Sequence, residues 1–121
     1  MGSEAYGQGQ QPDLDQARRK ANVAHGVVIK LKEMGLPPAL DSDLASLSTD
    51  LGDLWGAQKE LADRVEGFLK EPQNWEEVGD YLVDIRSSLD HIAWHLNSVR
   101  RPLNRTTRFA YRKVLEGDAN A

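Results

Sequence analysis

The chain has no cysteine and no long apolar run, and these absences exclude several classes of protein. Without cysteine there is neither a disulfide framework nor a thiolate metal site. No run approaches the roughly 18 apolar residues that a membrane-spanning helix needs. The first eleven residues carry no basic cluster followed by an apolar stretch, so they do not resemble a secretory signal. We therefore expect a cytoplasmic protein that does not engage a membrane.

What the chain does contain is typical of one soluble globular domain. Its 121 residues are 40% hydrophobic and 28% charged, which is an ordinary balance for such a domain. No segment shows the alternating pattern of a strand. We predict a single helical domain over residues 13–117, preceded by a disordered leader at 1–12 and followed by a frayed end at 118–121.

Apolar residues recur at steps of three and four along three long segments, which is the pattern of helices in a bundle. The first segment starts near Asp13 and is ended by Gly35, and the second covers 41–70. The third covers 75–101, because Asn74 and Glu77 form a capping box and Pro102 ends the helix. The short connections make neighbouring helices antiparallel. We predict an all-α antiparallel bundle of three long helices plus a short fourth helix within 103–117.

The third segment has the most regular apolar seam. Its members are Trp75, Val78, Leu82, Ile85, Leu89, Ile92, Leu96 and Val99. Because this seam supplies a complete core face, Arg86, His91 and Trp94 are left over for a second interface. In the second segment, Gly52 and Gly56 each cost about 1 kcal/mol relative to alanine. They therefore predict that another helix approaches closely there.

Charge is distributed unevenly along the chain. Thirteen acidic and four basic residues lie between Asp41 and Asp90, whereas six basic residues and no acidic one lie between Arg100 and Lys113. The basic segment also contains Phe109 and Tyr111. Basic residues interleaved with aromatic ones suit a single-stranded nucleic acid, through phosphate neutralisation and base stacking. The alternative is that this segment packs against the acidic middle of its own chain.

One stretch resembles a known family. Gly79-Asp80-Tyr81-Leu82, followed by Ile85-Arg86-Ser87-Ser88-Leu89-Asp90-His91-Ile92-Ala93-Trp94-His95-Leu96, is similar to a stretch in uncharacterised bacterial helical proteins. Those proteins in turn resemble the HEPN superfamily. The resemblance implies a helical bundle, usually a homodimer, in which an Arg-x(4–6)-His motif lines a cleft at the dimer interface. Active members cleave RNA without a metal, and other members keep only the fold.

The resemblance carries over to Arg86 and His91, the motif pair. A histidine can take the proton of a ribose 2′-hydroxyl or protonate the leaving oxygen, and an arginine can bind the phosphate. We infer that Asp90 orients His91 or pairs with Arg86. The predicted catalytic residues are thus Arg86, His91 and Asp90. The predicted phosphate contacts are Arg100, Arg101, Arg105 and Arg108, and the predicted interface residues are Trp94 and His95.

Two other interpretations stay open. In the first, Arg86, Asp90 and His91 form an inert polar face of a non-catalytic dimerisation or protein-interaction module. In the second, the chain resembles MazG-like nucleotide pyrophosphohydrolases, which hold Mg²⁺ on paired Glu-x-x-Glu and Glu-x-x-Asp motifs. The corresponding carboxylates here are Glu60, Asp63, Glu77 and Asp80. The preferred interpretation requires no cofactor.

Overall fold

The structure is a computed structural model that describes the backbone of residues 2–120 and the side chains of residues 14–117. Within this range it contains α1 (Gly2–Glu33), the 3-10 turn η1 (Pro38–Leu40), α2 (Asp41–Lys70) and α3 (Trp75–Asn120). The all-α prediction is therefore confirmed for the described chain. Helix α1 begins at Gly2, so the predicted helix start near Asp13 is wrong. The predictions of a disordered leader at 1–12 and a frayed end at 118–121 fall on residues whose side chains lie outside the described range. None of the described helices is both long and apolar enough to cross a bilayer.

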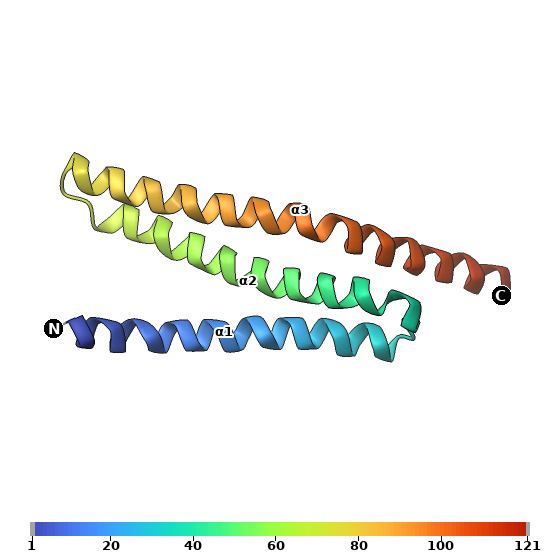
Figure 1. Ribbon diagram of the computed structural model, residues 1–121. Helices are drawn as coiled ribbons and strands as arrows, with labels where there is room; N and C mark the ends of the chain where they lie inside the picture. Colours follow the sequence, from blue (N-terminus) through green and yellow to red (C-terminus); the bar gives the residue numbers. More distant parts are fainter. Residues whose placement is uncertain (1, 121) are drawn as a thin grey trace.

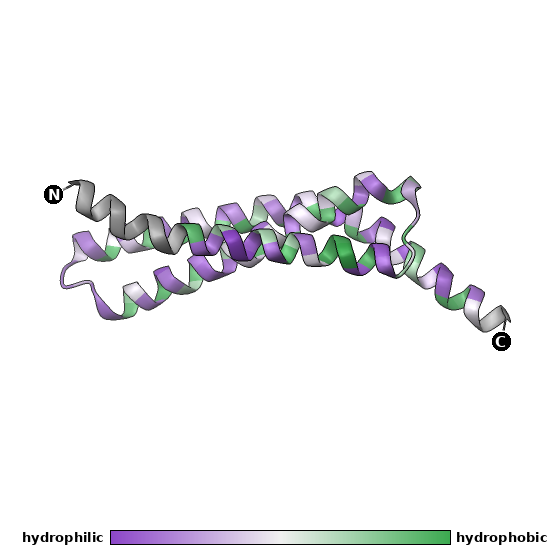
Figure 2. Cartoon of the chain, turned by 90° about the horizontal axis from the view of Figure 1, so that it is seen from below, coloured by the Kyte–Doolittle hydropathy of each residue, from purple (hydrophilic) through white to green (hydrophobic). Residues whose placement is uncertain are grey.

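The middle helix, α2, packs along both of the others (Figure 1). Consecutive helices run in opposite directions, whereas α1 and α3 make little direct contact with each other. The C-terminal end of α3 extends past the turn that joins α1 to α2. Hydrophilic and hydrophobic residues are interspersed along each helix (Figure 2). The described helices thus form an open layer, in which much of α1 and α3 faces away from α2.

Two helix ends follow the local sequence signals. After α1, Gly35 adopts a positive φ of 95°, which favours glycine, and the Leu36 amide donates to the Leu31 carbonyl at 3.0 Å. Before α3, the Glu77 amide donates to Asn74 Oδ1 at 2.9 Å, and the Glu77 carboxylate accepts from the Gln73 amide at 2.7 Å. Both the glycine stop and the capping arrangement are confirmed.

The close approach predicted from glycine occurs between α1 and α2. A Cβ atom added to Gly52 would lie 2.6 Å from the backbone oxygen of Lys20, and one added to Gly56 would overlap the Lys20 side chain. Both glycines are buried. A larger residue at either position would push the two helices apart, so these glycines set the spacing of α1 and α2.

The predicted helix break at Pro102, with a separate fourth helix after it, is wrong. Helix α3 continues through Pro102 to Asn120. A proline inside a helix costs about 3 kcal/mol, because it removes one backbone hydrogen bond and crowds the preceding turn. Here Pro102 and Thr106 are buried, and the Thr106 hydroxyl donates to the Pro102 carbonyl at 2.8 Å. The burial of Pro102 and Thr106 therefore offsets the local penalty.

The predicted apolar seam of α3 is right for half of its members and wrong for the other half. Val78, Ile85, Ile92 and Val99 are buried or half-buried, whereas Trp75, Leu82, Leu89 and Leu96 are exposed. The buried residues of α3 are Ser88, His95, Val99, Pro102 and Thr106, whereas Leu82, Leu89 and Leu96 are about half exposed. Ser88 and His95 precede Leu89 and Leu96 by one residue, and one residue rotates a helix face by about 100°. This partly polar face of α3 can be buried because its polar groups have hydrogen-bond partners. No buried side-chain nitrogen or oxygen in the described part lacks a hydrogen-bond partner.

Candidate functional site

A buried ionisable pair joins the first third of α2 to the middle of α3. His95 Nδ1 lies 3.0 Å from Asp50 Oδ1, and each side chain is only 7% exposed. The Ser98 hydroxyl donates to the second carboxylate oxygen of Asp50 at 2.7 Å. Both oxygens of a buried carboxylate are therefore satisfied, which such a group requires.

This pair reaches the protein surface through a second histidine. His91 is exposed, and its Nε2 lies 3.0 Å from Nε2 of His95, one helical turn later. The two rings are edge to face, with centroids 4.7 Å apart. The sequence-based prediction was that Asp90 orients His91 or pairs with Arg86. The structure instead gives His95 as the hydrogen-bond partner of His91, with Asp50 behind it.

The first helix contributes to the edge of this network. Asp53 Oδ2 lies 3.8 Å from His95 Nε2, and Asp53 Oδ1 lies 3.5 Å from Lys20 Nζ on α1. These distances correspond to charge attraction rather than short hydrogen bonds. The Lys20 ammonium group thus partly neutralises the Asp53 carboxylate that lies near His95. All three helices contribute a charged or polar side chain to the same region.

A pocket opens beside the network. It has a volume of about 400 Å³ and is lined by Ala45, Ser46, Thr49, Asp50, Asp53, Trp94, His95 and Ser98. Trp94 is 64% exposed and lies edge to face with His95, with ring centroids 4.8 Å apart. The exposed ring leaves a free aromatic surface at the mouth of the pocket, which suits stacking with a planar group.

The expectation that His95 lies on an exposed interface is corrected by its burial. His95 lies between α2 and α3, where its Nδ1 is 3.0 Å from Asp50 Oδ1. Sequence periodicity missed this because histidine and aspartate are normally assigned to the solvent face. The only sequence signal for the pair is the four-residue spacing of His91 and His95, which does not reveal Asp50.

Arg86 and Asp90 are both exposed on α3. His91 lies five positions after Arg86, so the two side chains leave the helix about 140° apart. Trp94 leaves the helix between these two directions. The ion pairs among the described residues do not include one between Arg86 and Asp90. The geometry of a single chain therefore does not bring Arg86, Asp90 and His91 to one point.

The four predicted phosphate contacts, Arg100, Arg101, Arg105 and Arg108, are all exposed on the continuous α3 helix. Arg105 lies 3.6 Å from Asp43 at the start of α2. The basic segment therefore partly contacts the acidic region of its own chain, as one of the two sequence interpretations expected. The exposed guanidinium groups also form a positively charged region along this part of α3.

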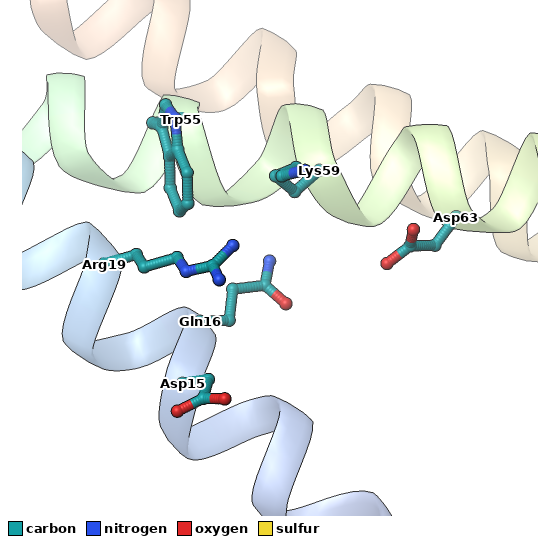
Figure 3. Close-up of a pocket in the computed structure, with 6 residues that line it drawn as sticks. All are labelled: Asp15, Gln16, Arg19, Trp55, Lys59 and Asp63. Carbon is teal, nitrogen blue, oxygen red and sulfur yellow. The ribbon is translucent and has the colours of Figure 1, made fainter.

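The carboxylates of the Mg²⁺ alternative are dispersed. Glu60 is bound to Arg64 at 2.6 Å, and Glu77 caps the start of α3. Asp63 lines a different pocket of about 240 Å³ between α1 and α2, together with Asp15, Gln16, Arg19, Trp55 and Lys59 (Figure 3). Asp80 is exposed. Across the described residues, no group of three or more His, Cys, Asp or Glu side chains is placed to hold a metal ion.

A second polar contact supports the α2–α3 packing two turns before His95. Arg64 donates to the Asp84 carbonyl at 2.7 Å and to the Ser88 hydroxyl at 2.6 Å. Ser88 is the most buried side chain of α3. The hydrogen bond from Arg64 explains why small, polar Ser88 faces α2 instead of Leu89. Arg64 also forms an ion pair with Glu60 on its own helix.

Comparison of the chain with models of protein families, with curated proteins and with solved structures found no match.

Proposed function

We propose that this chain is an RNA-interacting, HEPN-like domain that cleaves RNA without a metal, using a site shared between two copies. The observation that carries the proposal is the exposure of both motif residues, Arg86 and His91, on either side of Trp94. Neither side chain is buried between α3 and α2. Both are therefore available to a substrate and to a second chain.

The separation of the two motif residues favours a shared site. Within one chain Arg86 and His91 diverge by about 140°, so one phosphate does not meet both. A second copy that docks around Trp94 in the opposite direction brings Arg86 of one chain near His91 of the other, and two-fold symmetry then creates two equal sites. Such a pairing also converts the open layer into a larger antiparallel bundle.

The chemistry matches these residue types. His91 takes the proton of a ribose 2′-hydroxyl, and the 2′-oxygen then attacks the adjacent phosphorus. A bond forms between the 2′-oxygen and phosphorus, and the bond from phosphorus to the 5′-oxygen breaks. The leaving 5′-oxygen takes a proton from an imidazolium or from water. Arg86 binds the phosphate and offsets the charge that develops on it.

The test uses purified protein, labelled RNA and EDTA. Wild-type protein should cleave RNA in EDTA, and the variants Arg86→Ala and His91→Ala should each be inactive. Mixing the two inactive variants should restore about one quarter of the activity, because half of the randomly formed dimers contain one intact site of two. Absence of cleavage by the wild type contradicts the proposal. Cleavage without restoration on mixing contradicts the shared site.

A second candidate function is favoured by a separate observation. Leu82, Leu89, Leu96 and Leu103 are 43–50% exposed and lie exactly seven residues apart, so they form one line with a drift of only about 20° per step. We name this line the leucine stripe. Contiguous exposed apolar patches are often functional. The stripe favours a non-catalytic dimerisation module.

A second copy is the occupant that fits the stripe best. An equally spaced row of identical residues matches itself after a two-fold rotation, as an isologous interface requires. Leu89→Glu should convert a stripe dimer into a monomer in sedimentation measurements. Leu115→Glu, at an exposed leucine outside the stripe, is the matched control. A dimer that survives Leu89→Glu but is lost in Trp94→Glu instead supports the interface of the RNA-cleaving proposal.

A further inference from the structure

Two buried ionisable groups, Asp50 and His95, have no part in the reaction described above. They do not touch the exposed motif face, but they are linked to it through His91. We propose that Asp50 and His95 are positioning residues that hold His91 with its ring proton on Nε2 and its basic Nδ1 toward solvent. This inference rests on the proposed function, because it names what prepares His91 to accept a proton.

The order of donors and acceptors follows from the carboxylate. Asp50 only accepts hydrogen bonds when ionised, and the Ser98 hydroxyl already donates to its Oδ2. His95 must therefore carry a proton on Nδ1 to use the 3.0 Å contact with Oδ1. A neutral imidazole has one protonated nitrogen, so Nε2 of His95 is then an acceptor.

The contact between the two histidines then determines which ring nitrogen of His91 carries the proton. Its Nε2 faces the accepting Nε2 of His95 at 3.0 Å, so His91 donates from this nitrogen. The remaining nitrogen, Nδ1, carries a lone pair and has no proton. The exposed histidine thus offers solvent a proton acceptor at a defined atom, and the buried pair determines which atom it is.

The arrangement also stabilises the product of proton transfer. When His91 takes a proton at Nδ1, it becomes a cation that still donates from Nε2 to His95. The Asp50 carboxylate then faces a positive charge through one intervening ring, in a region with little water. Asp53 adds a second negative charge at 3.8 Å from His95, and Lys20 from α1 moderates it. No proton has to leave Asp50 or His95.

The proposal predicts a tautomer that can be measured without any RNA. The chain has three histidines, so ring signals in ¹⁵N-resolved spectra are assigned with His25→Gln and His91→Gln. Where both rings are neutral, His95 should carry its proton on Nδ1 and His91 on Nε2. The Nδ1 tautomer is the minor form of a free imidazole in water, so its dominance in His95 reports the effect of Asp50. A proton on Nε2 of His95 overturns the proposal.

Kinetics provide a second test. His95→Phe keeps a ring between α2 and α3 but removes the link, so kcat for RNA cleavage should fall about 100-fold. The KM for RNA should stay unchanged, because His95 is buried and does not contact substrate. Glu66→Gln, an exposed carboxylate change on α2, is the control with unchanged kinetics. Equal kcat in His95→Phe and wild type overturns the proposal even if the tautomers are as expected.

These measurements separate the two proposals. If wild-type protein does not cleave RNA, the proposed function fails, while the spectra still decide whether Asp50 and His95 set the tautomer of His91. If the protein cleaves RNA but His95 carries its proton on Nε2, the positioning role fails and the proposed function stands.

Discussion

His95 Nδ1 lies 3.0 Å from Oδ1 of Asp50, a residue 45 positions earlier in the chain. This contact places a carboxylate and an imidazole in the middle of an interface that apolar periodicity assigns to leucines. It also connects the interior to exposed His91. The pair therefore influences both the stability of the α2–α3 contact and the chemistry available at the surface.

Removing the carboxylate should weaken the fold. Asp50→Ala leaves the Nδ1 proton of His95 and the Ser98 hydroxyl without their buried acceptor, which costs about 2–3 kcal/mol of unfolding free energy. Urea unfolding followed by circular dichroism measures this loss. Asp63→Ala, at an exposed position of the same helix, should change stability by less than about 0.5 kcal/mol. Equal effects of the two substitutions contradict the importance of the buried pair.

Two glycine-to-alanine substitutions should have opposite effects. At Gly52 the new Cβ would lie 2.6 Å from the Lys20 carbonyl, so α1 must move away, and we expect a loss of about 1–3 kcal/mol. At Gly79 nothing lies within 4 Å, so alanine should stabilise α3 by up to about 1 kcal/mol. Urea unfolding of both variants tests the helix spacing. A stabilised Gly52→Ala variant shows that α1 does not approach α2 so closely.

Tyr81 should make the fold sensitive to alkaline pH. Its pKa is raised from the usual 10.0, first by desolvation and then by the carboxylates of Glu71, Glu77 and Asp84. As the pH rises through 10, the unfolded chain loses this proton before the folded one, so the folded state holds more protons and stability falls. Below pH 10 the contribution is fully present. The Tyr81→Phe variant should lose stability less steeply in unfolding measurements between about pH 9 and 11.

The control for that experiment is Tyr111→Phe, because Tyr111 is an exposed tyrosine of the same helix. This variant should retain the wild-type dependence on pH. A Tyr81→Phe variant with an unchanged alkaline slope means that Tyr81 ionises at the same pH in the folded and unfolded chains.

RNA binding should depend on salt through the basic residues of α3. Arg101 and Arg108 are exposed and seven residues apart, so they project from the same side of the helix. Replacing both with glutamine should reduce the slope of log K against log salt by about 1.4, since each lost phosphate contact of a single strand contributes about 0.7. Fluorescence anisotropy over a salt series measures the slope. Arg18→Gln, at an exposed position of α1, should leave it unchanged.

Local signals in the sequence correctly predicted where helices end. Gly35 ends α1 because its positive φ is accessible to glycine, and Asn74 with Glu77 begins α3 because their side chains satisfy free backbone amides. These effects involve residues within a few positions of each other. The break expected at Pro102 failed for the opposite reason: the proline penalty is local, but the packing that offsets it comes from elsewhere in the chain.

The candidate site was predicted only in part. The spacing of Arg86 and His91 marked two side chains that are indeed exposed on α3. Asp50 was not identified, because it lies far away in sequence, and its role depends on which face of α2 meets α3. Sequence alone also placed His95 on an interface with another chain, whereas it is buried within its own chain.

The amino-acid sequence by itself determined the helical class, the end of α1 before Gly35, the start of α3 after Asn74 and the close approach at Gly52, since these depend on short-range backbone and steric effects. Only the tertiary structure decided which face of α3 is buried. Two faces compete, one lined by Leu82, Leu89 and Leu96 and the other by Ser88 and His95. Burial of apolar area favours the first, but Arg64 and Asp50 on α2 need partners and find them on the second. Periodicity counts apolar residues on one helix and cannot include the polar groups that the neighbouring helix presents.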